Sequence, residues 1–220
     1  MKRIASILAI CISIGVSSVW ADIVDWSQLG PSFTVLPSPQ LWTSQAGQTG
    51  LVGVVGGGTF ERLDQGNGWN GNFLPGSALI WNQGNGDFLF SFDTPLSGIS
   101  MAVQADPYGP FMATLSAYDS GMNLLGITTM SGVSNNMPGT ALVISFYSNV
   151  QDISLVRVGF FDSLGGDSGA ACTMSLHPDP GKPPGADPCS SNSPVPEPGS
   201  LPLLSTGVLG VIWTIRRRLS

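Results

Sequence analysis

Hydrophobic and polar residues alternate along the middle of this chain in short stretches, and this alternation restricts its fold more than any other feature. Residues 111–118 show it best, because every second side chain there is apolar. The apolar positions are Phe111, Ala113, Leu115 and Ala117, and Leu125, Ile127 and Thr129 alternate again after the turn at residues 119–121. A period of two is typical of a strand with one buried face. The two stretches and their turn therefore predict a β-hairpin.

Further stretches of the same kind lie on both sides of this hairpin. Around a predicted turn at residues 94–98, the alternating residues are Phe88, Phe90 and Phe92 before it and Ile99, Met101 and Val103 after it. Residues 141–147 and 153–161 predict two more strands, the second with a slip near Leu155 that indicates a β-bulge. We therefore predict an all-β fold, a single jelly-roll-like β-sandwich at residues 22–176.

The first 21 residues have the order of a secretory signal peptide. Lys2 and Arg3 precede an apolar run at residues 4–16, and Ala21 supplies the small residue that suits signal peptidase. The run is too short to span a bilayer and stands at the start of the chain. We expect residues 1–21 to form a signal peptide helix that is removed on export, so that the mature chain starts at Asp22.

The other end of the chain carries a second apolar run with positive charges beside it. Residues 201–215 are largely apolar, and Arg216, Arg217 and Arg218 follow at once. Fifteen helical residues are roughly 22 Å long, against a hydrocarbon core of about 30 Å. Arginines favour the cytoplasmic side, so a short transmembrane helix here would leave the rest of the chain outside. This orientation agrees with the one that a signal peptide sets.

Between the predicted sandwich and this tail, residues 177–194 form a segment rich in Pro, Gly and Ser. Such a composition buries too little apolar surface to form a core. We expect it to be an extended, solvated linker that begins with His177. It would hold the sandwich away from the surface that the tail reaches.

Charge limits the partners of the exported part. Residues 22–200 carry three basic and fourteen acidic side chains, a formal net charge of −11. The whole-chain value of −6 understates this acidity, because five of the eight basic residues lie in the two terminal segments. Nucleic acid and anionic lipid are therefore not expected as partners of the exported part.

Two cysteines remain once Cys11 leaves with the signal peptide. Cys172 and Cys189 are the natural pair for a disulfide in an oxidising compartment, and closing a loop of this size would stabilise the fold by about 3 kcal/mol. Free thiols and intermolecular bridges are the alternatives. Two cysteines and one histidine do not provide the four ligands of a structural zinc site.

Residues 64–73 form a distinctive stretch with oxygen-bearing side chains around a tryptophan. The candidate calcium ligands are Asp64, Asn67, Asn70 and Asn72. Calcium takes six to eight oxygen ligands, so with one carboxylate a tight site would need Asp87 or Asp106 as well. The alternative is a cluster of Asn and Gly turns. No other cofactor is expected.

The chain has no convincing set of catalytic residues. Residues 166–169 (Gly-Asp-Ser-Gly) resemble the nucleophile segment of trypsin-like serine proteases, but the only histidine, His177, follows them at the start of the predicted linker. No spacing among Asp106, Asp119, Asp162 and Asp167 singles out the paired carboxylates that a glycosidase needs. We therefore predict a protein that is not an enzyme.

Four aromatic residues offer flat faces on which sugar rings stack. They are Trp42, Trp69, Trp81 and Tyr108. In a small sandwich such residues are more often part of the core. A glycan-binding module is therefore the alternative function, and an exposed aromatic row would favour it.

The tail at residues 195–220 resembles the PEP-CTERM sorting domain. A Val-Pro-Glu-Pro-Gly-Ser segment precedes the apolar run and the arginine cluster, and this three-part order is more specific than any one part. The resemblance implies recognition by an exosortase, a membrane-embedded cysteine enzyme similar to transpeptidases, and removal of the hydrophobic segment. It assigns Pro196, Glu197 and Pro198 to the recognition motif and Arg216, Arg217 and Arg218 to the cytoplasmic stop. Such proteins occur in Gram-negative bacteria that make exopolysaccharide.

Together these features predict an exported, non-enzymatic protein. We expect it to be anchored in the inner membrane by its C-terminal helix and then released to the cell surface or the extracellular biofilm matrix. The expected partners are an exosortase-type enzyme, the membrane and exopolysaccharide. The alternatives are a glycan-binding module of that matrix and a secreted carbohydrate-active enzyme, which two facing carboxylates in a cleft would favour.

Overall fold

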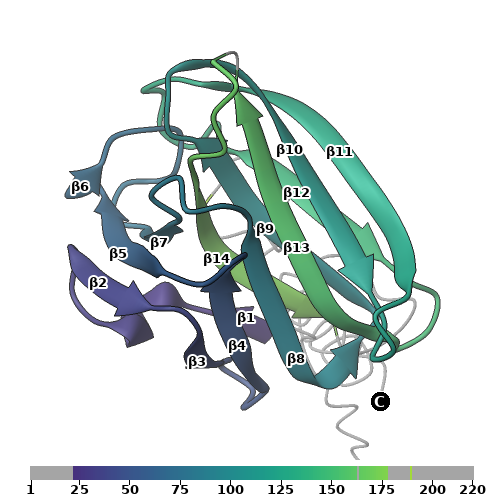
Figure 1. Ribbon diagram of the computed structural model, residues 1–220. Helices are drawn as coiled ribbons and strands as arrows, with labels where there is room; N and C mark the ends of the chain where they lie inside the picture. Colours follow the sequence, from purple (N-terminus) through teal and green to yellow (C-terminus); the bar gives the residue numbers. More distant parts are fainter. Residues whose placement is uncertain (1–21, 163, 178–188, 190–220) are drawn as a thin grey trace, which may run out of the picture.

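The computed structural model describes residues 22–162, 164–177 and 189. These residues form two sheets that pack face to face, antiparallel except for one short parallel pair, with one short 3-10 helix, η1 (Trp26–Leu29) (Figure 1). The predicted β-sandwich is therefore confirmed. No helix in this part of the chain has the length and apolar character needed to cross a membrane. The helices predicted within residues 1–21 and 195–220 lie outside the described residues.

One sheet, named sheet A here, has eight strands. Its main path, in spatial order, is β12 (Leu142–Tyr147), β9 (Gly98–Ala105), β14 (Gly169–His177), β7 (Ala78–Trp81), β5 (Thr59–Gln65) and β2 (Thr34–Pro37). Beside this path, β1 (Asp22–Val24) pairs with β14, and β6 (Gly68–Trp69) pairs with β5. The final strand includes His177, one residue beyond the predicted end of the sandwich.

The other sheet, sheet B, has six strands. Their spatial order is β11 (Leu124–Ser134), β10 (Gly109–Tyr118), β13 (Ile153–Asp162), β8 (Phe88–Leu96), β4 (Thr49–Val54) and β3 (Gln40–Thr43). The predicted hairpin is the pair β10 and β11, and the side chains at its predicted apolar positions on β10 are buried. The register of β13 against β8 shifts between Ile153 and Leu155, where the bulge was predicted.

The strands from β7 onward have jelly-roll connectivity. Strands β12, β9, β14 and β7 are consecutive in sheet A, and β11, β10, β13 and β8 are consecutive in sheet B. The chain crosses between the sheets at each connection except the β10–β11 hairpin, which produces two interlocked Greek keys. The earlier strands widen the sandwich, since β5 adds to β7 and β4 adds to β8.

The buried apolar residues form two hydrophobic clusters, one on each face of sheet A. The larger lies between the sheets and contains Trp26, Phe60, Phe88 and Phe90, each with no exposed surface. Burying a side chain of this size stabilises the fold by about 1.5 to 3 kcal/mol. The second cluster lies on the opposite face of sheet A, because its strand residues alternate with those of the first. Its members are Leu63, Trp69, Phe73, Leu79, Ala102, Ala141, Ala170, Cys172 and Cys189.

Candidate functional site

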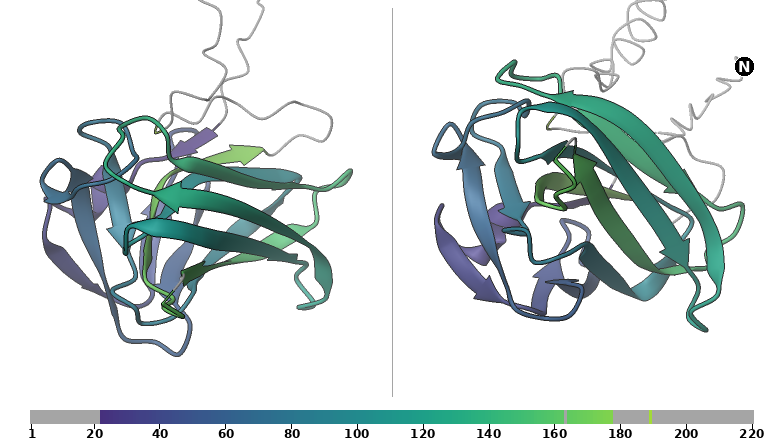
Figure 2. Two further views of the ribbon diagram at one scale, coloured as in Figure 1. Left: turned by 90° about the horizontal axis from the view of Figure 1, so that it is seen from above. Right: turned by 45° about the horizontal axis from the view of Figure 1, so that its top comes forward.

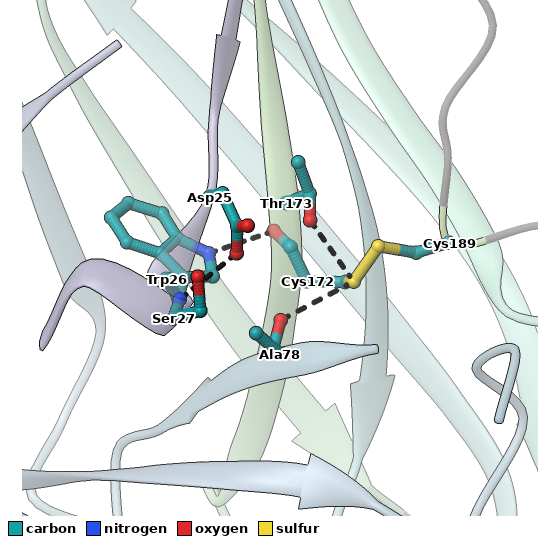
Figure 3. The surroundings of a disulfide bond; sticks show 7 residues. All are labelled: Asp25, Trp26, Ser27, Ala78, Cys172, Thr173 and Cys189. Atoms are coloured by element: carbon teal, nitrogen blue, oxygen red, sulfur yellow. Dashed lines mark hydrogen bonds between the residues drawn. A yellow bond between two sulfur atoms is a disulfide. The ribbon is translucent and has the colours of Figure 1, made fainter. Parts of the chain in front are cut away.

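The predicted disulfide joins Cys172 of β14 to Cys189, with 6.2 Å between their Cα atoms. Both cysteines are buried in the second cluster, and the amide of Leu74 donates a hydrogen bond to the carbonyl of Cys189 at 3.1 Å. Figure 3 shows the bond beside η1, where the indole Nε1 of Trp26 donates to the carbonyl of Cys172 at 3.0 Å. The disulfide therefore fastens a residue beyond the last strand to the middle of sheet A.

A pocket of about 360 Å³ opens beside this disulfide. Its lining includes Asp25, Ser27, Gln45, Arg62 and Thr173, together with Cys189. Asp25 caps η1, because its carboxylate accepts a hydrogen bond from the amide of Ser27 at 2.9 Å. The pocket is therefore built from the start of η1, β5, β14 and residues 74–78, and Trp26 and the disulfide tie η1 and Cys189 to β14.

Arg62 is the charged group buried at this pocket, with 5% of its surface exposed. Its guanidinium pairs with Asp64, two residues along the same strand, at 2.5 Å. Its Nε has no hydrogen-bond partner among the described residues. Arg62 is not among the predicted site residues. The sequence does contain a signal for it, because Arg62 stands at the alternate position between Phe60 and Asp64 and so shares a strand face with both.

The stretch predicted to bind calcium is largely committed to the fold. Asp64 pairs with Arg62, and Asn67 exchanges backbone hydrogen bonds with Asp64. The buried Asn72 amide donates to the carbonyl of Val133 at 2.9 Å, and its side-chain oxygen accepts from the amide of Asn135 at 2.8 Å. No cluster of three or more His, Cys, Asp or Glu suited to a metal is present in the described part of the chain.

These contacts give Asn72 a structural role that the sequence did not indicate. Its side chain ties residues 66–77, which cover the outer face of sheet A, to the end of β11. It is not available as a metal ligand unless these hydrogen bonds break. Asn70 is exposed, and its carbonyl accepts a hydrogen bond from the hydroxyl of Tyr108 at 2.9 Å. Calcium binding by the remaining candidates stays a prediction.

Ser168 lies in a polar network at one end of the sandwich. Its hydroxyl accepts a hydrogen bond from Nε1 of Trp81 at 3.0 Å and donates one to Asp106 at 3.3 Å. Partial burial raises the pKa of Asp106; the hydrogen bond from Ser168 lowers it, and the charge of Asp162 raises it further. The fold thus brings Asp106 and Asp162 close enough to interact electrostatically.

His177 lies at the opposite end of β14 from Ser168. The strand between them has nine residues, which at about 3.3 Å per residue separate the two by roughly 30 Å. His177 is buried against the ring of Tyr147, with ring centroids 5.4 Å apart. This burial lowers the pKa of His177 to about 4. The histidine therefore cannot act as the base for Ser168 in this fold.

The four aromatic residues proposed as sugar platforms do not form an exposed row. Trp42 and Trp69 are buried, with 1% and 5% of their surface exposed, and Trp81 is half-buried against Trp69. Tyr108 is the one exposed member of the four, at 59%. The tryptophans thus contribute to packing, which was the alternative interpretation.

The burial of His177 predicts a loss of stability in mild acid. Its pKa is about 4 in the folded chain against an ordinary 6.5, so the unfolded chain takes up a proton first as the pH falls. We expect the free energy of unfolding to drop between pH 6.5 and pH 4, by about 1 to 2 kcal/mol at pH 5. Urea unfolding at pH 7.5 and pH 5 measures this drop.

The matched variant His177→Gln removes the titrating group from the same position. It should reduce the difference in unfolding free energy between pH 7.5 and pH 5, whatever it does to stability at pH 7.5. Asp106 acts in the opposite direction, because a raised folded pKa makes its protonation favour the fold. If His177→Gln leaves the loss of stability at pH 5 unchanged, His177 is ruled out as its source.

Comparisons with known proteins give a match to a sequence motif and similarities to solved structures. A DUF4465 family protein from Bacteroides caccae, known from a crystal structure, aligns with 12% identity and a TM-score of 0.41, covering 70% of this chain and 98% of its own. No curated protein gives a significant match. At the C-terminus, residues 194–218 match the PEP-CTERM protein-sorting motif. The resemblance of the tail is therefore confirmed, and the chain carries the sorting motif of exosortase substrates.

Proposed function

We propose that this chain is a non-enzymatic exported protein, that an exosortase-type enzyme processes its tail, and that the sandwich then stays at the cell surface or in the extracellular matrix. The observation that carries the proposal is the sorting motif at residues 194–218. The buried disulfide supports it, because disulfides form and persist in oxidising compartments outside the cytoplasm. Binding to exopolysaccharide stays a prediction.

The geometry of the chain ends is compatible with this processing. Asp22, the predicted first residue of the mature chain, pairs with Leu176 at the end of the last strand. The disulfide then fixes Cys189, and the eleven residues 190–200 between it and the apolar run span at most about 40 Å. While the tail is still attached, the chain length would therefore keep Cys189 within about 40 Å of the membrane surface at which the tail is cut.

The intact mass of the protein, recovered from membrane, surface and culture-medium fractions of its native host, tests the proposal. Surface material should lack the first 21 residues and the segment after about Pro198. The membrane fraction should contain the longer intermediate. A tail that is retained in every fraction would mean a simple anchored protein and would contradict the proposal.

A further inference from the structure

Strand β11 forms an open edge of sheet B. It pairs with β10 on one side, and the described residues provide no strand partner on its other side. Figures 1 and 2 show it at the outside of the sandwich. An edge strand presents a row of unpaired N–H and C=O groups, which is a template for pairing with another chain. β11 is the longest strand of the structure, with 11 residues.

The sequence of β11 lacks charge and proline, two of the usual protections of an edge strand, and its one irregularity is a register shift near its start, at Leu124 to Gly126. Residues 124–134 read LLGITTMSGVS and contain no charged residue and no proline. The other three edges are shorter: β2 and β3 have four residues each, β12 has six, and β2 ends in Pro37. Short edges, charges and prolines are the devices that keep sheets from joining.

Several apolar side chains of β11 are exposed. Leu124, Ile127 and Val133 are each more than half exposed. On the outer face of sheet B, Met112 lies opposite Ser131 of β11, and Phe161 lies opposite Met112 on the next strand. Met112 and Phe161 are 40% and 59% exposed, so the apolar surface continues inward from the edge.

Charge restricts which partner can approach this edge. Residues 22–177 carry eleven acidic side chains and two basic ones, so two copies repel each other over most of their surface. Because β11 carries no charged residue, antiparallel pairing of two β11 strands places no like charges opposite each other. An edge strand is also complementary to itself, because antiparallel pairing about a two-fold axis matches each free donor with the same strand's acceptors.

We propose that β11 pairs antiparallel with β11 of a second copy of this chain, which joins the two B sheets into one continuous sheet. The partner's Ile127 and Val133 would cover apolar side chains that are otherwise in water. This inference goes beyond the proposed function, because the pairing would form whether or not the tail is cut.

Disulfide trapping in the envelope of the native host tests the pairing with the full chain. Single cysteines are introduced on the outer face of β11, as Ile127→Cys, Thr129→Cys and Ser131→Cys. Only a cysteine near the two-fold axis meets its own copy, so we expect at least one of the three to give a reducible dimer. The matched control is Thr114→Cys, which lies opposite Thr129 on the neighbouring strand β10.

The control separates two geometries. Edge-to-edge pairing leaves a cysteine at position 114 far from its copy, whereas stacking of two outer faces would bring it close. A dimer with Thr114→Cys as strong as with the β11 cysteines would overturn the proposal. So would monomers with all three β11 variants.

A second pair of variants tests the edge-to-edge pairing by placing a charge on one edge strand or the other. Val133→Lys, added to the best cross-linking variant, should reduce the dimer about ten-fold, because a lysine on an edge strand prevents pairing. Leu41→Lys should leave the dimer unchanged, since Leu41 is exposed on β3, the opposite edge of the same sheet. Formation of the Cys172–Cys189 disulfide, checked by mass, shows that each variant has folded. An equal effect of the two lysines would overturn the proposal.

Discussion

Replacing Pro196, Glu197 and Pro198 by alanine is expected to leave the chain in the membrane fraction with its hydrophobic tail attached. These residues lie in the matched sorting motif, and Glu197 is its only acidic side chain. An enzyme site built to recognise a charged group rejects a substrate that lacks it, so we expect the surface-released form to fall by more than about ten-fold. Intact mass and quantification of the protein in each fraction measure the change.

Asp187→Ala is the matched control for this experiment. Asp187 also stands before a proline near the tail, but it lies outside residues 194–218. Release should continue in this variant, whereas a general effect of charge near the tail would reduce it equally. Unchanged release of the alanine variant of the motif would show that the motif does not direct processing here.

The strands that carry a clean alternation were predictable from the sequence. On β10 the apolar positions fall on every second residue, and all of them face the core between the sheets. The bulge in β13 was also visible, because one extra residue moves the alternation by one position and the register shifts at that place. In such strands the local pattern and the tertiary packing require the same residues.

The early strands were not predictable because close packing requires glycines in them. Gly50 lies inside β4, where a Cβ atom would stand 2.0 Å from the carbonyl oxygen of Ser91 and 2.5 Å from the ring of Trp42. Gly53 of the same strand faces Ser38 in a similar way. In a sequence such glycines indicate loops, and only the neighbouring strand shows that they allow a close approach.

The candidate site was predictable only in part. The disulfide followed from the cysteine count, but its partners in the fold did not: the pocket joins Asp25, Arg62 and Thr173, which are far apart in sequence. The position of His177 was also unpredictable, because the Pro-rich sequence starts at the next residue although β14 still includes His177. Tertiary contacts decided these points.

Removing the disulfide is expected to cause the largest loss of stability of the changes considered for the sandwich. Cys189→Ala should lower the free energy of unfolding by about 3 kcal/mol, because the bond closes a loop of 17 residues and so limits the unfolded chain. For a domain of this size that corresponds to a fall of roughly 6 to 12 °C in Tm. Thermal and urea unfolding of residues 22–193 measures both quantities.

A comparison of the single and double cysteine variants tests the disulfide more sharply than either single variant does. Cys172→Ala, Cys189→Ala and the double variant should all lose the same free energy, because each removes one and the same link. Reduction of the unmodified protein should produce a similar loss. Free thiols at these positions would instead give two separate, smaller losses that add in the double variant, since Cys172 and Cys189 are both buried in the second cluster and each contributes packing there.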